Sequence, residues 1–128
     1  GMTLSRSDIS VLAQAKSANF CGQFILLREY DIHPSQVENL YLAGAFANYI
    51  DTNNAIDIGF VANIPSDRII KVGNASLEGA TIMLLSGNLR DRIEKIVRKI
   101  RHIELETTPD FFDIFVEGCM FKPMHIET

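Results

Sequence analysis

Two segments of the chain share a pattern that could place backbone atoms against a ligand. In each, a short apolar run ends in glycine before a helical pattern begins: Leu40-Tyr41-Leu42-Ala43-Gly44-Ala45-Phe46 and Ile69-Ile70-Lys71-Val72-Gly73-Asn74-Ala75. Glycine lets another group approach the backbone closely, and ligands of α/β sheets tend to bind beyond the carboxyl ends of the strands. The pair therefore predicts a pocket at Gly44 and Gly73, although close packing of the chain explains the two glycines equally well.

The residues around these glycines limit the chemistry of such a pocket. The phosphate-binding patterns GxxxxGKS/T and GxGxxG are absent, as are the catalytic patterns GxSxG and HExxH. Asp51 and Asp57 follow the Gly44 turn, but helix capping and exposure to solvent explain both carboxylates more simply than a role in the pocket does. We therefore predict no catalytic residue, and a site suited to an apolar, flat group held between backbone edges.

The cysteines and histidines do not have the spacing of a metal site. Cys21 and Cys119 lie far apart, neither belongs to a CxxC or CxxH pair, and His33, His102 and His125 are isolated. A composite site of Cys119 and His125 is conceivable, but reduced thiols in the core explain the cysteines better. The sequence thus predicts no bound metal.

The composition indicates one globular domain over residues 1–128, because 47% of the residues are apolar and 22% are charged. The formal charge of -4 gives no general attraction to nucleic acid or to an anionic membrane. The chain contains neither an apolar run of membrane-spanning length nor a signal peptide, which favours a cytoplasmic location. Gly1 before Met2 is expected to be a scar left by an expression tag.

Helical and strand patterns alternate in the first half of the chain. Ser5 or Ser7 is expected to cap a helix that runs to about Tyr30. The face that this helix should pack against its neighbours consists mostly of small residues: Val11, Ala15, Ala18, Gly22 and Ile25. Residues 39–43 predict a short strand, and Asp51 or Thr52 should begin a short helix that Gly59 ends.

The second half continues the alternation. Residues 69–72 predict a second buried strand, and Asn74 or Ser76 should cap a helix that runs to about Leu85. This helix is apolar almost all round, so we expect it to be buried, with a close packing contact at Gly79.

The last elements differ in their expected exposure. Residues 89–101 predict an amphipathic helix that carries half of the twelve Lys and Arg residues, and a solvated face explains it better than an anionic partner does. Residues 102–106 predict a third strand. Thr108 and Pro109 should open a final apolar helix that docks on the body. Together the elements predict an α/β fold with a short, mostly parallel sheet flanked by helices.

Three stretches of the chain resemble one family, in the same order along the sequence. Residues 41–51 (YLAGAFANYID), residues 72–80 (VGNASLEGA), and Glu104-Leu105-Glu106 with Pro109-Asp110-Phe111 look like the C-terminal region of the reductive activators of corrinoid proteins. The resemblance implies a partial ribonuclease H-like or actin-like half-domain of the ASKHA group, the ATPases related to acetate kinase, sugar kinases and actin.

The resemblance also implies a function. Such activators use ATP to help move an electron from an iron-sulfur centre to a Co(II) corrinoid, which restores Co(I) for methyl transfer. The resemblance implies that the complete parent protein binds ATP and Mg. It also implies two partners for this chain: the corrinoid protein and the remaining domains of the parent chain. The residues that would line the adenosine side of the nucleotide cleft are Gly44, Ala45, Phe46, Asn48, Gly73 and Asn74.

Several departures from that family pattern qualify these expectations. The usual three-stranded meander, the second half-domain and an acidic metal anchor are not visible, and Ala45 replaces a second glycine. The iron-sulfur ligands would also have to lie in another module. The chain therefore looks like an excised C-terminal piece or a short relative without turnover of its own. The alternative is a non-enzymatic interaction module or homodimer, since missing strands leave a sheet edge uncovered.

Overall fold

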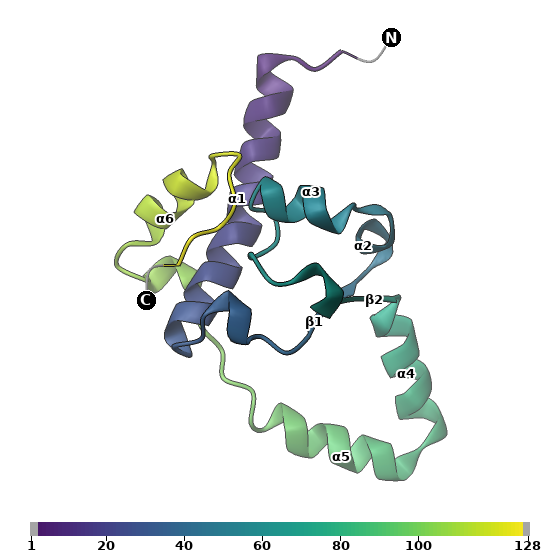
Figure 1. Cartoon of the computed structure of the whole chain (residues 1–128). Coiled ribbons are helices and arrows are strands. Elements are labelled where there is room, and N and C mark those ends of the chain that lie inside the picture. The colour runs from purple at the N-terminus through teal and green to yellow at the C-terminus, as the bar shows by residue number, and fades with distance from the viewer. Residues whose placement is uncertain (1–2, 127–128) are drawn as a thin grey trace. The chain divides into compact units, whose positions relative to one another are not determined.

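The structure is a computed structural model that describes residues 3–126, so the expected tag scar at Gly1 and Met2 lies outside the described residues. The chain forms two compact units (Figure 1). The first unit comprises the residues up to Leu40, Asp51–Ile69 and the residues from Glu104 onward. The second unit comprises Tyr41–Ile50 and Ile70–Ile103.

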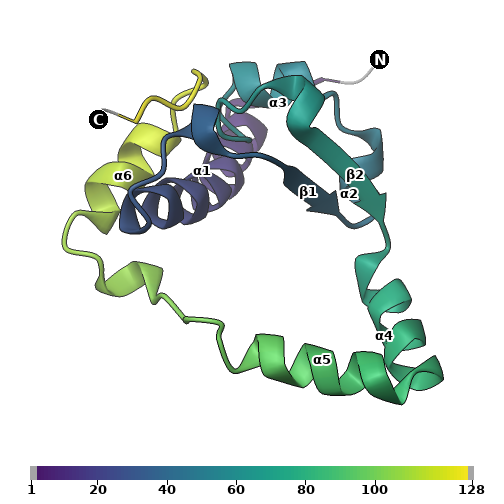
Figure 2. The same cartoon turned by 60° about the horizontal axis from the view of Figure 1, so that its bottom comes forward.

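The first unit is built on the long helix α1 (Arg6–Glu29). The predicted start is confirmed: the Ser5 hydroxyl accepts from the Asp8 amide, and the Asp8 carboxylate accepts from the Ser5 amide at 2.9 Å. This reciprocal capping box satisfies two backbone donors that the first helical turn would otherwise leave unpaired. Helix α6 (Phe111–Gly118) lies beside α1 in both ribbon views (Figures 1 and 2).

The buried face of α1 differs from the predicted one. Of the predicted face only Ile25 is buried, whereas Val11, Ala15 and Ala18 are exposed. The other buried residues are Lys16, Ser17, Phe20 and Cys21. The reason is the approach of α6, because the Ser17 hydroxyl donates to the Phe115 carbonyl at 2.5 Å. A Cβ atom at Gly118 would stand 2.5 Å from that hydroxyl. The small residues that let the helices approach are thus Ser17 and Gly118.

Short elements complete the first unit. They are the 3₁₀-helices η1 (Pro34–Gln36), η2 (Ser66–Arg68) and η3 (Leu105–Thr107), and the helix α3 (Thr52–Asp57). The Asp51 carboxylate caps α3 by accepting from the Asn54 amide at 2.9 Å, and Gly59 follows the helix with φ +71°, so both predictions are confirmed. The core of the unit contains Ile25, Ala55, Val61, Ile64, Ile114 and Met124.

Two predictions for the C-terminal region are wrong. Residues 102–106 form no strand: residues 102–104 are irregular and the last two residues begin η3, because the sheet described here consists of β1 and β2 and offers this segment no neighbour. Helix α6 starts at Phe111 with Asp110 as its N-cap, rather than at Pro109 after Thr108. The Asp110 carboxylate binds the Arg28 guanidinium through two hydrogen bonds of 2.6 and 2.9 Å, which ties the helix start to the end of α1.

The second unit carries the sheet except for the first residue of each strand. Its strands β1 (Leu40–Ala43) and β2 (Ile69–Gly73) run parallel, which confirms the predicted α/β class. The short helix α2 (Ala45–Tyr49) follows β1 directly, where the sequence indicated only a turn. Helices α4 (Ala75–Leu85) and α5 (Gly87–Val97) follow β2 (Figure 2). Asn74 caps α4 as predicted.

The predicted burial of α4 is wrong. None of its residues is buried, and Leu77, Leu84 and Leu85 are 65%, 81% and 78% exposed. The expected close contact at Gly79 is also missing, since a Cβ atom there would meet nothing within 4 Å. An all-round apolar helix needs neighbours on several sides, and packing along α5 covers only part of its surface.

Candidate functional site

The two glycines singled out by the sequence lie together at the carboxyl ends of the parallel strands. The Gly44 amide donates to the Gly73 carbonyl at 2.7 Å, which extends the pairing of β1 and β2 by one hydrogen bond. Gly44 has φ +100° and ψ 161°, and Gly73 has φ +65°. Both conformations are strained for residues with a side chain. Backbone geometry therefore explains why each strand ends in glycine.

The surface beside these two glycines is open. A Cβ atom built on Gly44 or on Gly73 would meet no heavy atom within 4 Å. Close packing therefore does not explain the two glycines in this structure, because no neighbouring group lies where their side chains would be. Both glycines are half-exposed, so an approaching ligand would find part of their backbone accessible.

The other predicted site residues have different surroundings. Ala45, Phe46 and Asn48 lie on α2 and are exposed, with Phe46 at 68%. The Asn74 side chain is engaged in the fold, because its oxygen accepts from the Leu77 amide at 3.0 Å and caps α4. The corner thus combines an open backbone, an exposed aromatic ring at the first turn of α2, and a capping amide.

One residue of this corner was missed by sequence reasoning. The Lys71 ammonium on β2 donates to the Ile50 carbonyl at 2.6 Å and to the Asn48 carbonyl at 3.4 Å. A charged residue inside an otherwise apolar strand was the available signal. The sequence could not indicate its partners, because they are backbone carbonyls near the end of α2 and just after it.

A second lysine was also missed, and it lies in the core of the first unit. Lys16 is only 1% exposed, and its ammonium donates to the Gly118 carbonyl at 2.7 Å and to the Met120 carbonyl at 2.5 Å. The rings of Phe20 and Phe121 lie 5.2 and 6.0 Å from the same nitrogen. Burial lowers the pKa of Lys16, because desolvation disfavours its charged form. The arrangement holds the C-terminal end of α6 against α1.

Other polar side chains within residues 3–126 form a surface ion pair or are free thiols. The Arg28 guanidinium lowers the pKa of the exposed Asp110 carboxyl through their hydrogen bonds, an ion pair at the surface. Cys21 is buried and Cys119 half-buried, and both are free thiols. Among residues 3–126, no group of three His, Cys, Asp or Glu side chains could hold a metal ion. No helix within this range is long and apolar enough to cross a membrane.

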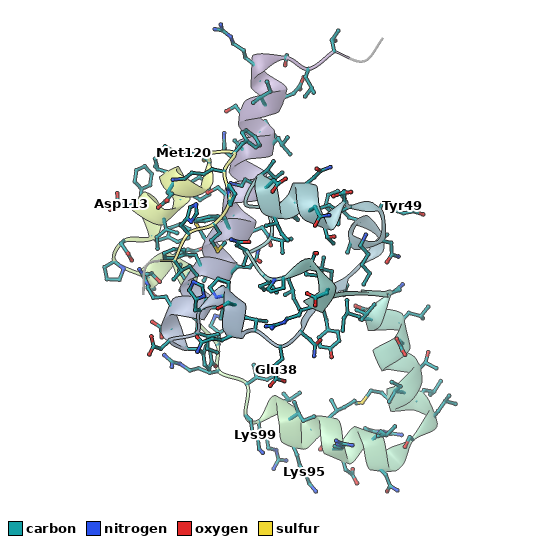
Figure 3. The ribbon with its side chains drawn as sticks, in the orientation of Figure 1. Glu38, Tyr49, Lys95, Lys99, Asp113 and Met120 are labelled. Carbon is teal, nitrogen blue, oxygen red and sulfur yellow. The ribbon has the colours of Figure 1, made fainter. Side chains whose placement is uncertain are left out.

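Figure 3 shows how exposed side chains of the second unit project from the ribbon. Tyr49 extends away from the end of α2. Lys95 and Lys99, four residues apart, point away from the α5 region in the same direction. These lysines belong to the amphipathic segment, whose predicted helix is confirmed but ends at Val97 and not at residue 100, so Lys99 follows the helix.

Comparison with known proteins finds two relatives whose names both refer to corrinoid proteins or their activation. The chain is 35% identical over 118 residues to the corrinoid activation enzyme RamQ of Eubacterium limosum. This alignment covers 92% of the present chain and 20% of RamQ. It is 25% identical over 118 residues to the [Co(II) methylated amine-specific corrinoid protein] reductase of Methanosarcina barkeri, covering 91% of this chain and 22% of the relative.

A solved structure shows the same fold. The reductive activator for a corrinoid, iron-sulfur protein superposes with a TM-score of 0.84 at 32% identity, over 94% of this chain and 19% of the other. The chain thus spans about one fifth of the length of these relatives. The family model of the C-terminal domain of RACo, the ASKHA domain, matches residues 1–128. The resemblance seen in the sequence is therefore confirmed, and this chain belongs to the family of RACo C-terminal ASKHA domains.

Proposed function

We propose that this chain is the nucleotide-binding C-terminal domain of a reductive activator of a corrinoid protein. In the full-length protein, ATP binding would support the transfer of one electron to a Co(II) corrinoid, which gives Co(I). The observation that carries the proposal is the open corner at Gly44 and Gly73, in a chain that matches the ASKHA domain along its whole length. We also propose that the two units work as one domain.

The residues of the corner fit the adenosine part of ATP. Gly44 and Gly73 allow a ligand to approach the strand ends, and the exposed Phe46 ring offers a flat apolar surface. Mg²⁺ takes many of its ligands from phosphate and water, and we place its protein ligands in the remaining domains. Bound ATP and Mg would supply the energy of nucleotide hydrolysis, while this chain would bind and orient the nucleoside.

The iron-sulfur centre does not fit this chain. A cluster is held by four cysteine thiolates as a rule, and the sequence contains two cysteines. We therefore place the electron donor in another module of the parent protein and derive no step through it here. The free thiols of Cys21 and Cys119 support a reducing compartment, and we propose the cytoplasm.

The Gly44→Val variant tests the nucleotide site. In the full-length protein, we expect it to weaken ATP binding at least about tenfold, roughly 1.4 kcal/mol, because φ +100° excludes a β-branched residue and its methyl groups fill the open space. Isothermal titration calorimetry measures the affinity. Gly79→Val is the matched control, since Gly79 also has open space but no positive φ. An unchanged affinity in Gly44→Val would remove the basis of the proposal.

A second candidate is an interaction or dimerisation module on the same scaffold. The exposed leucines of α4 favour it, because side chains of this size are usually covered in a stable assembly. On this view, two copies of the chain should associate, and sedimentation velocity should show a dimer at micromolar concentration. A monodisperse monomer over the whole concentration range would speak against it.

A further inference from the structure

We infer that Lys71 is a positioning residue that holds helix α2 in place beside the proposed nucleotide site. The inference rests on the proposed function for its consequence, but its structural basis is independent of ATP. Lys71 would act through the backbone of α2 and would not itself touch the nucleotide.

Helix α2 is attached to strand β2 at both of its ends. Before its first residue, the Gly44 amide donates to the Gly73 carbonyl at 2.7 Å. After its last residue, the Ile50 carbonyl accepts from the Lys71 ammonium at 2.6 Å, with the Asn48 carbonyl as a second acceptor at 3.4 Å. The segment between these two attachments contains three of the predicted site residues: Ala45, Phe46 and Asn48.

A helix of this length depends on such attachments. α2 has five residues, and its N-cap Gly44 has no side chain that could cap it. Isolated helices of so few residues are unstable in water, because nucleation costs more than the few hydrogen bonds return. The carbonyls at a helix end also lack partners within the helix. A charged donor at those carbonyls is therefore expected to stabilise α2 more than a neutral one.

The alternation of side chains along β2 places the Lys71 ammonium on the face of the sheet where α2 lies. Side chains alternate along a strand, so Lys71 projects from the face opposite to Ile70 and Val72. Because the Lys71 ammonium reaches the end of α2, that helix lies on the Lys71 face of the sheet. The lysine in this otherwise apolar strand thus places its ammonium group at the carbonyls near the end of α2.

Loss of the ammonium would remove the attachment after the last residue of α2, while the Gly44 hydrogen bond and the buried Ala47 would remain. The C-terminal end of α2 would then sample several positions relative to strand β2, and the position of the Phe46 ring would vary with it. A ligand that needs both the open glycine corner and the Phe46 ring would bind more weakly, because ordering α2 would become part of the cost of binding.

Hydrogen exchange tests the attachment without nucleotide. In the full-length protein, Lys71→Met should speed exchange of the amides of residues 46–50 roughly fivefold, the effect of one lost hydrogen bond. Lys71→Arg should keep exchange near the wild-type rate, since its guanidinium also donates. Lys95→Met, an exposed lysine of α5 in the same unit, serves as the control and should leave these amides unchanged. Unaltered exchange in Lys71→Met would overturn the inference.

ATP affinity tests the consequence. We expect Lys71→Met to weaken ATP binding roughly fivefold, with Lys71→Arg and Lys95→Met within about twofold of wild type. If Gly44→Val loses affinity and Lys71→Met does not, the positioning role is wrong and the nucleotide site stands. If the wild-type protein binds no ATP while exchange in Lys71→Met is faster, the proposed function fails and the attachment of α2 stands.

Discussion

Lys16→Ala is expected to lower the free energy of unfolding by about 4 kcal/mol, within the range of large-to-small core substitutions. Lys16 is among the largest fully buried side chains, so its truncation leaves a cavity between α1 and α6. It also leaves the Gly118 carbonyl, at the buried end of α6, without its donor. Urea unfolding followed by circular dichroism measures the loss. A loss below about 1 kcal/mol, the size of one ordinary hydrogen bond, would contradict this account.

Lys16→Met separates packing from hydrogen bonding, because methionine fills most of the same volume without a donor. We expect it to cost about 2 kcal/mol, less than alanine, since the unpaired carbonyl is offset in part by removal of a buried charge. The methionine variant also provides the reference for the effect of pH. If both variants lose the same stability, the cavity contributes nothing and the packing argument is wrong.

The effect of pH on Lys16 has a definite sign. Burial lowers the pKa of Lys16 in the folded chain below its ordinary value of 10.5, with neighbouring Lys122 acting in the same direction and Cys119 opposing it. Between these two pKa values the unfolded chain binds more protons, so the contribution of Lys16 to stability rises with pH. The stability difference between wild type and Lys16→Met should therefore grow toward pH 10.5. A difference that stays constant would show that the pKa is not lowered.

Gly59→Ala is expected to destabilise the chain by about 3 kcal/mol, the sum of a strained φ and an overpacked contact. Gly59 has φ +71°, and a Cβ atom there would stand 2.3 Å from the Lys122 carbonyl oxygen and 3.2 Å from the Lys16 ammonium. The first contact involves backbone, so the segment after α6 must move. Chemical unfolding should therefore show a large loss of stability together with faster proteolysis after α6.

Gly79→Ala provides the control for Gly59→Ala. The same methyl group enters open space in the middle of α4, where alanine favours the helix by up to about 1 kcal/mol. We expect this variant to be at least as stable as the wild type. Equal effects of the two substitutions would mean that the contact between Gly59 and Lys122 does not constrain the C-terminal segment.

The two stability predictions and the nucleotide site concern different units. Lys16 and Gly59 hold α1, α3 and the C-terminal segment together in the first unit, whereas Gly44, Gly73 and Lys71 form the corner of the second. Variants of the corner are therefore expected to alter nucleotide binding with little effect on the core of the first unit. This separation lets binding and stability be measured as independent properties.

The sequence by itself determined the features that depend on a few neighbouring residues. The caps at Ser5, Asp51 and Asn74, the end of α3 at Gly59 and both strands of the sheet follow from side-chain hydrogen bonds, backbone preferences and apolar runs within one turn or strand. The glycine corner was predicted for the same reason, and three short stretches sufficed to indicate the family. The roles of the site residues remain predictions.

Only the tertiary structure decided the features that depend on which segments meet. It placed Lys16 and Ser17 rather than Ala15 and Ala18 on the buried face of α1, because α6 approaches there. It also left residues 102–106 without a strand partner and α4 exposed, and it joined Lys71 to the end of α2. These outcomes depend on contacts between residues far apart in the chain, whose energies local sequence patterns do not encode.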